Sequence, residues 1–235
     1  IDACLVGSEM CIRDRCGRRG DYLKEKAQII SKKTNNEVLD VQADVSKTED
    51  CKKLIEQTMA TFKKVDVLVN NAGASAAGMF EDVTDKIWED DINLKLMATV
   101  RMCRLVIPYM KASQSGVIIN ATIGGGKAPS AGSLPTTVTR AAGINLTKSL
   151  ANEYAKHNIR VNAICIGLLK SAQWDRRAGP SGVNDLYKEM SKKVPMGKVG
   201  DEIDYANLVA FLSSEKSAYI TGTAINLDGG LCPVV

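Results

Sequence analysis

A hydroxyl and a guanidinium stand four positions apart in a segment that could present both groups to one ligand. Thr136 and Arg140 belong to a stretch that starts at Pro135, a residue favoured at the first helical position, and continues to about His157. Side chains at positions i and i+4 point along one face of a helix. A Thr hydroxyl ionises far less readily than a Tyr hydroxyl, whereas a guanidinium keeps its charge. The segment therefore predicts a helix face that is better suited to binding than to proton transfer.

A turn with two amide side chains follows the apolar run from Val65 to Asn70. It reads Asn70-Asn71-Ala72-Gly73, and Gly73 would let the backbone approach a bound ligand closely. In doubly wound sheets, dinucleotides bind beyond the carboxyl ends of the strands. The turn is thus a candidate dinucleotide site, and the alternative is a turn that only terminates a strand.

The elements that must position these residues alternate along the chain. Short apolar runs predict strands at 38–42, 65–70, 116–120, 159–164 and 223–227, and the stretches between them predict helices at about 51–62, 84–109, 135–157 and 185–190. Ser46 and Glu49 have the spacing of a capping box for the first of these helices. The pattern predicts an α/β fold, with a doubly wound, Rossmann-like parallel sheet in a single domain.

Composition limits the functions that the chain could have. The chain has 235 residues, 45% of them hydrophobic, and a net charge of +4 with acids and bases interspersed, which gives little support for nucleic-acid binding. Seven cysteines without C-x-x-C spacing and a single His argue against a metal site. No apolar run approaches the length of a membrane-spanning helix. We expect a soluble, cytoplasmic protein with reduced thiols and neither nucleic-acid nor membrane partners.

Several motifs in order give the chain a family resemblance. The turn Asn70-Asn71-Ala72-Gly73 resembles the N-N-A-G motif of the short-chain dehydrogenase/reductase family. The similarity extends over about residues 16 to 230, through Asp44-Val45, Asn93, residues 159–163, and Tyr219-Ile220-Thr221-Gly222 leading to Asp228-Gly229-Gly230. The resemblance implies the fold predicted above and an NAD(P)-dependent oxidoreductase that acts on a small carbonyl or alcohol substrate.

The resemblance also implies cofactor-binding residues. By analogy Asp44 would bond the adenine amino group, although it could equally cap the turn into Ser46. Arg18 and Arg19 follow the counterpart of the family's second strand, where a guanidinium can hold a 2′-phosphate, so NADP is favoured over NAD unless this is an ordinary basic loop. The other positions implied to contact the cofactor are Val45, Asn71, Ala72, Gly73, Arg140, Gly167 and Ser171. For Ser171, helix capping is the alternative.

The catalytic positions depart from the family pattern. Alignment places Thr136 at the position of the family's Tyr, Arg140 at that of its Lys, and Ile123 at that of its Ser. Ile123 cannot bond a carbonyl, but neighbouring Thr122 could if the loop shifts by one residue. Asn93 matches the family residue that holds a water in a proton relay, although an Asn in a helix can also bond nearby backbone.

The N-terminal segment departs from the pattern as well. The family's first strand and its glycine-rich loop have no counterpart in residues 1–15, which we interpret as a non-native segment resembling adapter read-through, ahead of a domain over 16–235. We expect the sheet to lack its first strand unless residues 1–10 substitute for it. Gly124-Gly125-Gly126 also follows a strand, but no helix begins soon after it, so it predicts a turn beside the substrate and not a phosphate site.

Two functions remain open from the sequence. One is a divergent oxidoreductase with atypical catalytic residues, and the other is a catalytically silent dinucleotide- or partner-binding protein on the same scaffold. The irregular segment from Gly167 to Val194 is expected to cover the substrate, whose identity it does not reveal. Family members commonly pair through long helices, so we expect a homo-oligomer.

Overall fold

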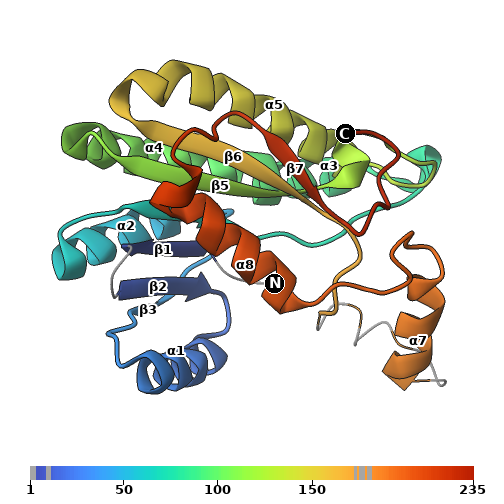
Figure 1. Cartoon of the computed structure of the whole chain (residues 1–235), viewed down its shortest axis with the longest axis horizontal. Coiled ribbons are helices and arrows are strands. Elements are labelled where there is room, and N and C mark those ends of the chain that lie inside the picture. The colour runs from blue at the N-terminus through green and yellow to red at the C-terminus, as the bar shows by residue number, and fades with distance from the viewer. Residues whose placement is uncertain (1–3, 9–11, 172–173, 175–177, 179–181) are drawn as a thin grey trace.

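Seven strands form one sheet in the computed structural model, which describes residues 4–8, 12–171, 174, 178 and 182–235 (Figure 1). In order across the sheet they are β3 (Asp40–Gln42), β2 (Ile12–Gly17), β1 (Cys4–Ser8), β4 (Val67–Asn70), β5 (Gly116–Ile123), β6 (Ile159–Ile166) and β7 (Ala224–Leu227). Neighbouring strands are parallel, except that β1 is antiparallel to both β2 and β4. The predicted strands at 38–42, 65–70, 116–120, 159–164 and 223–227 are confirmed, with small shifts at their ends.

Helices cover both faces of the sheet. Leu68 and Ile118 point to the face covered by α2, α4 and α5, whereas Val69 and Ile119 point to the face on which Leu212 of α8 packs. This alternation is the period-2 pattern of strands buried on both sides. The helices are α1 (Gly20–Thr34), α2 (Thr48–Phe62), α3 (Asp85–Asp91), α4 (Ala98–Ser113), α5 (Thr136–Tyr154), α7 (Gly182–Ser191) and α8 (Glu202–Ser213). None of the helices in the described ranges is both long and apolar enough to cross a membrane.

Two helical predictions need correction. The long helix expected at 84–109 is divided into α3 and α4 by a π-helical turn, Ile92–Met97, while Pro108 lies inside α4. The predicted capping box does not form, because α2 begins at Thr48 and the Ser46 hydroxyl donates to Asp44 Oδ1 at 2.7 Å. A short polar side chain bonds its local turn as readily as a helix end, so the spacing alone could not decide.

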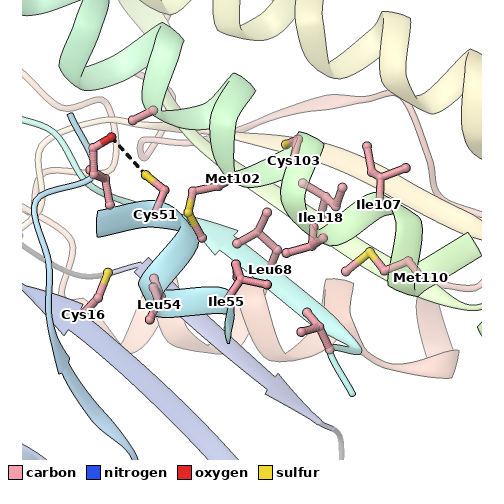
Figure 2. Packing of buried hydrophobic residues seen from close by; sticks show 14 of the residues in the cluster. Cys16, Cys51, Leu54, Ile55, Leu68, Met102, Cys103, Ile107, Met110 and Ile118 are labelled. Atoms are coloured by element: carbon pink, nitrogen blue, oxygen red, sulfur yellow. Dashed lines mark hydrogen bonds between the residues drawn. The ribbon is translucent and has the colours of Figure 1, made fainter. Parts of the chain in front are cut away.

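The larger hydrophobic core lies between α2, α4, α5 and the sheet. Leu54 and Ile55 of α2 and Met102 of α4 gather around Leu68 of β4, as Figure 2 shows. Two thiols are part of this core: burial raises the pKa of Cys51 to about 11 and that of Cys103 to about 12. Both therefore stay protonated near neutral pH and act as small apolar side chains.

β1 occupies the place of the family's first strand, which we expected to be missing unless residues 1–10 substituted for it. β1 lies between β2 and β4, so residues from that segment do substitute for the strand. Ser8 pairs with Ile12, and Cys4 pairs with Asn70. The next described element after β1 is therefore the antiparallel strand β2 and not a helix, so the loop and helix that follow the family's first strand have no counterpart after β1 in the described ranges.

We predict that proline in β1 destabilises the whole domain. Val6 pairs with Asp14 on one side and Leu68 on the other, so Val6→Pro removes an N–H from the middle of the sheet. Each buried polar group left unpaired should lower the free energy of unfolding by about 1 to 3 kcal/mol. Urea denaturation followed by circular dichroism measures this change.

Val6→Ala is the matched control, because it shortens the side chain but keeps the backbone N–H. The proline variant should unfold at clearly lower urea concentration than the alanine variant. Equal midpoints would contradict a central position for β1.

Candidate functional site

The candidate site lies along the edge of the sheet where the parallel strands β2, β4, β5 and β6 end. Two cavities meet there, and Gly73 and Ala74 line both of them. The first cavity is lined by Cys16, Gly17, Arg18, Ala43, Asp44, Val45, Ala72, Gly73, Ala74 and Leu94. The second has a volume of about 680 Å³ and a mainly apolar lining that includes Ile123, Ile166, Leu169, Trp174 and Leu231.

The first cavity brings together most of the residues predicted for the adenosine end of a cofactor. Arg18, Asp44, Val45, Ala72 and Gly73 come from the ends of β2, β3 and β4, far apart in sequence, and share one lining. Parallel strands bring their carboxyl ends to one edge of the sheet, which explains why these turns converge.

Asp44 caps the turn into Ser46, which was the alternative to a role in binding adenine. Its Oδ1 accepts from the backbone N–H of Ser46 at 3.0 Å and from the Ser46 hydroxyl at 2.7 Å. Burial opposes ionisation of this carboxyl, but the two bonds from Ser46, together with the charges of Arg18 and Lys47, hold the pKa of Asp44 below its ordinary value. The carboxylate is thus fixed in its charged form at the wall of the first cavity, where its remaining lone pairs can accept from a ligand.

The two predicted arginines separate. Arg18 lines the first cavity, and its backbone carbonyl accepts from the Gln42 side chain at 2.9 Å. The guanidinium of Arg19 instead lies over the ring of Tyr22 on α1, 4.6 Å from the centroid. Of the two, Arg18 is the one that the structure brings to the cavity.

Arg140 joins the two cavities from α5. Its Nη1 donates to the carbonyl of Ala121 on β5 at 2.6 Å, and its Nη2 lies so close to Gly73 that a Cβ there would overlap it. Its Nε is buried without a hydrogen-bond partner among the described residues. Burial lowers the pKa of Arg140, and the nearby carboxylate of Asp91 opposes that shift. The guanidinium therefore presents a buried, partly unsatisfied donor group to the site.

Thr136 lines the second cavity one helical turn before Arg140. Its hydroxyl oxygen accepts from the backbone N–H of Ala76 at 3.0 Å and from Lys95 Nζ at 2.9 Å. The hydroxyl itself donates a long hydrogen bond of 3.4 Å to Asp91 Oδ1. The predicted pair on one helix face is therefore present, and both of its members reach the same cavity.

A buried ion pair beneath Thr136 was not predicted. Asp91 and Lys95 are paired across the junction of α3 and the π-helical turn, with side chains only 2% and 1% exposed. Thr139 of α5 donates to Asp91 Oδ2 at 2.6 Å. The i, i+4 spacing of Asp91 and Lys95 is the available sequence signal, but such pairs are usually solvated, as the preceding pair of Lys86 and Asp90 is.

Four further predicted residues have different positions. Asn93 is outside the cavity lining, and its Oδ1 accepts from Arg101 Nη2 at 2.7 Å, so the predicted water-holding side chain is engaged within its own helix. Thr122 lines the second cavity, but its hydroxyl bonds the Ile164 carbonyl of β6 at 3.3 Å. Gly167 and Ser171 both line the second cavity, and the Ser171 N–H donates to the Tyr187 hydroxyl at 3.0 Å.

The two Asn residues of the motif have different roles: Asn70 bonds within the protein, and Asn71 lines a cavity. Asn70 Nδ2 donates to Asn120 Oδ1 at 2.9 Å, and Asn120 in turn donates to Thr147 of α5 at 2.9 Å. This chain of bonds ties β4, β5 and α5 together beneath the cavities. Asn71 lines the second cavity, so it is the second amide of the motif that is available to a ligand.

Comparison with known proteins shows the family of the chain. A protein-family model described as enoyl-(acyl carrier protein) reductase matches residues 16–232. The chain belongs to the short-chain dehydrogenase/reductase family. It is 34% identical over 211 residues to 3-oxoacyl-(acyl-carrier-protein) reductase FabG of Staphylococcus epidermidis, covering 88% of this chain and 84% of that protein. It is also 34% identical over 194 residues to Oxidoreductase UcpA of Escherichia coli, covering 81% and 74%.

Solved structures of short-chain dehydrogenases/reductases have the same fold. L-sorbose reductase from Gluconobacter frateurii, complexed with NADPH and L-sorbose, superposes with a TM-score of 0.90 at 29% identity, over 94% of this chain and 87% of that one. An NADPH-bound short chain oxidoreductase from Pseudomonas aeruginosa, described as containing an atypical catalytic center, superposes at 0.87 with 28% identity and the same coverage. The Rossmann-like α/β fold is thereby confirmed.

We predict that Gly73→Ala weakens dinucleotide binding by displacing Arg140. The added Cβ would overlap Nη2, so the guanidinium must leave the turn. Loss of this contact should raise the Kd for NADPH about tenfold, which corresponds to about 1.4 kcal/mol. Isothermal titration calorimetry measures the affinity.

Gly143→Ala is the control, because a Cβ at that position of α5 would meet Thr122 at an ordinary contact distance of 3.7 Å. It should bind NADPH as the wild type does. If Gly73→Ala also binds NADPH with wild-type affinity, the contact between Arg140 and Gly73 is not needed for dinucleotide binding.

Proposed function

We propose that this chain is an NAD(P)-dependent oxidoreductase that interconverts a carbonyl and an alcohol, with Thr136 and Arg140 in the roles of the family's Tyr and Lys. One observation carries the proposal: both side chains line the cavity that meets the Asn71–Gly73 turn at the edge of the sheet. When bound, a reduced nicotinamide supplies the hydride. The protein's part is to hold the reactants together and to provide the proton.

The residues present suit a dinucleotide at both of its ends. At the adenosine end, Asp44 offers carboxylate oxygens and Arg18 a positive charge. At the nicotinamide end, the buried Nε of Arg140 lacks a partner among the described residues, and ribose hydroxyls would satisfy it. The described residues provide no glycine-rich loop for the pyrophosphate, so these two ends would contribute most of the binding energy.

Thr136 is the proposed proton donor to the carbonyl oxygen. A free Thr hydroxyl is a weak acid, but here its oxygen accepts from Ala76 N–H and Lys95 Nζ, and both bonds favour departure of its proton. The short side chain reaches less far than Tyr would, so the carbonyl must approach α5 closely. Gly124 and Gly125, which also line the cavity, leave room for that approach.

The proposed substrate is a compact, mainly apolar carbonyl compound. Ile123 replaces the family's Ser and makes that wall apolar, as do Ile166, Leu169 and Trp174. Asp228 also lines the cavity, but its carboxylate already accepts from Gly230 N–H at 2.9 Å and Cys232 N–H at 2.7 Å. A substrate rich in hydroxyl groups would leave many of them without partners on these walls.

A binding protein without turnover is the second candidate. Its support is that Asn93 bonds Arg101 and so leaves the site without the family's water-holding side chain. Under this alternative the cavities would bind a dinucleotide, and no hydride would be transferred.

We predict that Thr136→Val strongly reduces turnover but leaves NADPH binding intact. NADPH oxidation is measured across a panel of small ketones and aldehydes. Loss of the hydroxyl should lower kcat by about 10² to 10⁴, the usual contribution of general acid catalysis, with little change in the Kd for NADPH. Arg140→Ala should instead weaken NADPH binding as well.

Val is nearly isosteric with Thr, so Thr136→Val removes the hydroxyl with little change in packing. Equal turnover of variant and wild type would exclude Thr136 as proton donor. Binding of NADPH by a wild type that turns over none of the panel would favour the second candidate.

We propose NADP over NAD because Arg18 lines the adenosine end and a guanidinium can hold a 2′-phosphate in bidentate fashion. The L-sorbose reductase and the Pseudomonas aeruginosa oxidoreductase, both described with NADPH, support the same preference. Arg18→Ala should raise the KM for NADPH about tenfold and leave the KM for NADH unchanged.

Arg19→Ala is the matched control, since that guanidinium stacks on Tyr22. It should not alter the ratio of the two KM values. If both arginine variants change the ratio equally, the preference depends on general charge and not on a site at Arg18.

A further inference from the structure

We propose that Lys95, held in place by Asp91, is a positioning residue for Thr136: it directs the Thr136 hydroxyl into the cavity and restores its proton during carbonyl reduction. This inference rests on the proposed function. It gives the buried pair of Asp91 and Lys95 a role that is separate from the roles of Thr136 and Arg140. It follows from hydrogen bonding at a single oxygen atom.

The lone pairs of Thr136 Oγ1 are both occupied. A hydroxyl oxygen has two acceptor positions and one proton to donate. Ala76 N–H and Lys95 Nζ take the two acceptor positions at 3.0 and 2.9 Å. The hydroxyl donates its proton to Asp91 Oδ1 in a long hydrogen bond of 3.4 Å, and a rotation of the O–H would turn the proton into the cavity that Thr136 lines. A carbonyl oxygen in the cavity would be the closer acceptor.

Asp91 is a poor competitor for this proton. Its Oδ1 pairs with Lys95, and its Oδ2 accepts from Thr139 at 2.6 Å. The carboxylate therefore anchors the ammonium group, and Thr139 ties the carboxylate to the same helix that carries Thr136. All the residues of this network, Asp91, Lys95, Thr136 and Thr139, are buried.

Lys95 is also suited to give up a proton. Burial lowers the pKa of Lys95; the hydrogen bond and charge of Asp91 oppose the shift, and the charge of Arg140 on α5 adds to it. Asp91 and Arg140 are the charged groups that act on Lys95 from its own helix and from α5. The side chain is 1% exposed, so it exchanges protons with solvent through Thr136.

The proton transfers then balance. As the carbonyl carbon gains the hydride, the carbonyl oxygen takes the proton from Thr136 Oγ1, and Thr136 Oγ1 takes a proton from Lys95 Nζ. The products are an alcohol, the oxidised dinucleotide and a neutral Lys95 beside the Asp91 carboxylate. After the alcohol leaves, a solvent proton entering the cavity returns to Lys95 through the Thr136 hydroxyl.

The test replaces both charges at once, so that neither is left buried without its partner. Asp91→Leu with Lys95→Met should lower kcat for ketone reduction about 100-fold, with little change in the KM for NADPH. Asp91→Asn with Lys95→Gln, which keeps polar groups of similar size, should show the same loss if the first variant folds poorly. Thermal unfolding followed by circular dichroism verifies the fold of each variant.

Asp90→Leu with Lys86→Met is the matched control, because this i, i+4 pair lies beside the buried one but is 64% and 72% exposed. Its kcat should equal that of the wild type. A comparable loss in the control, or a normal kcat in both folded variants of the buried pair, overturns the proposal.

A second comparison separates positioning from a purely structural role. In a Thr136→Val background and at saturating NADPH, replacing Asp91 and Lys95 should lower kcat no further, since the pair contributes to proton transfer through that hydroxyl. A further loss of similar size overturns the proposal. If the wild type itself reduces no carbonyl, the proposed function fails, whereas a wild type that turns over with an unimportant Lys95 refutes only this inference.

Discussion

The docking of Arg140 against two strand ends is the constraint on which the site depends. The guanidinium reaches from α5 to the Ala121 carbonyl of β5 and to the turn at Gly73 that follows β4. It can do so only because residue 73 has no Cβ. The contact anchors the start of α5 against these strand ends, and Thr136 lies one turn before Arg140 on the same helix face. The geometry of the candidate site is thus set by one buried side chain and one missing side chain.

A buried charge in this position needs compensation, and the structure supplies it on a neighbouring helix. Asp91 lowers the electrostatic cost of placing Arg140 and Lys95 close together, because it is the carboxylate that acts on both. The π-helical turn between α3 and α4 lies where Lys95 meets α5. Such turns often occur at functional sites. The same carboxylate therefore supports the fold of the α4–α5 layer and the ionisation of the site.

The sequence predicted most of the sheet and the helix face, and the reasons are physical. The runs that became β4, β5 and β6 are rich in Val and Ile, which is a strong signal for central parallel strands, and they are buried along almost their whole length. Thr136 and Arg140 share a helix face because i, i+4 spacing leaves no other geometry. The burial of Asp91 and Lys95 could not be predicted, since the same spacing describes the exposed pair of Asp90 and Lys86. Only tertiary packing distinguishes the two pairs.

The direction of β1 shows a second limit of the same kind. Side chains alternate between the two faces with period 2 whether a strand runs parallel or antiparallel to its neighbours. A hydrophobic pattern therefore does not reveal the direction of a strand. Here β1 pairs antiparallel with both β2 and β4, and the start of β1, not its end, lies beside Asn70 at the edge with the cavities. A parallel strand would deliver a loop and a helix N-terminus to that edge, where they could bind a pyrophosphate. With β1 reversed, affinity for a dinucleotide must come from the groups on either side, which are Arg18 and Asp44 at one end and Arg140 at the other.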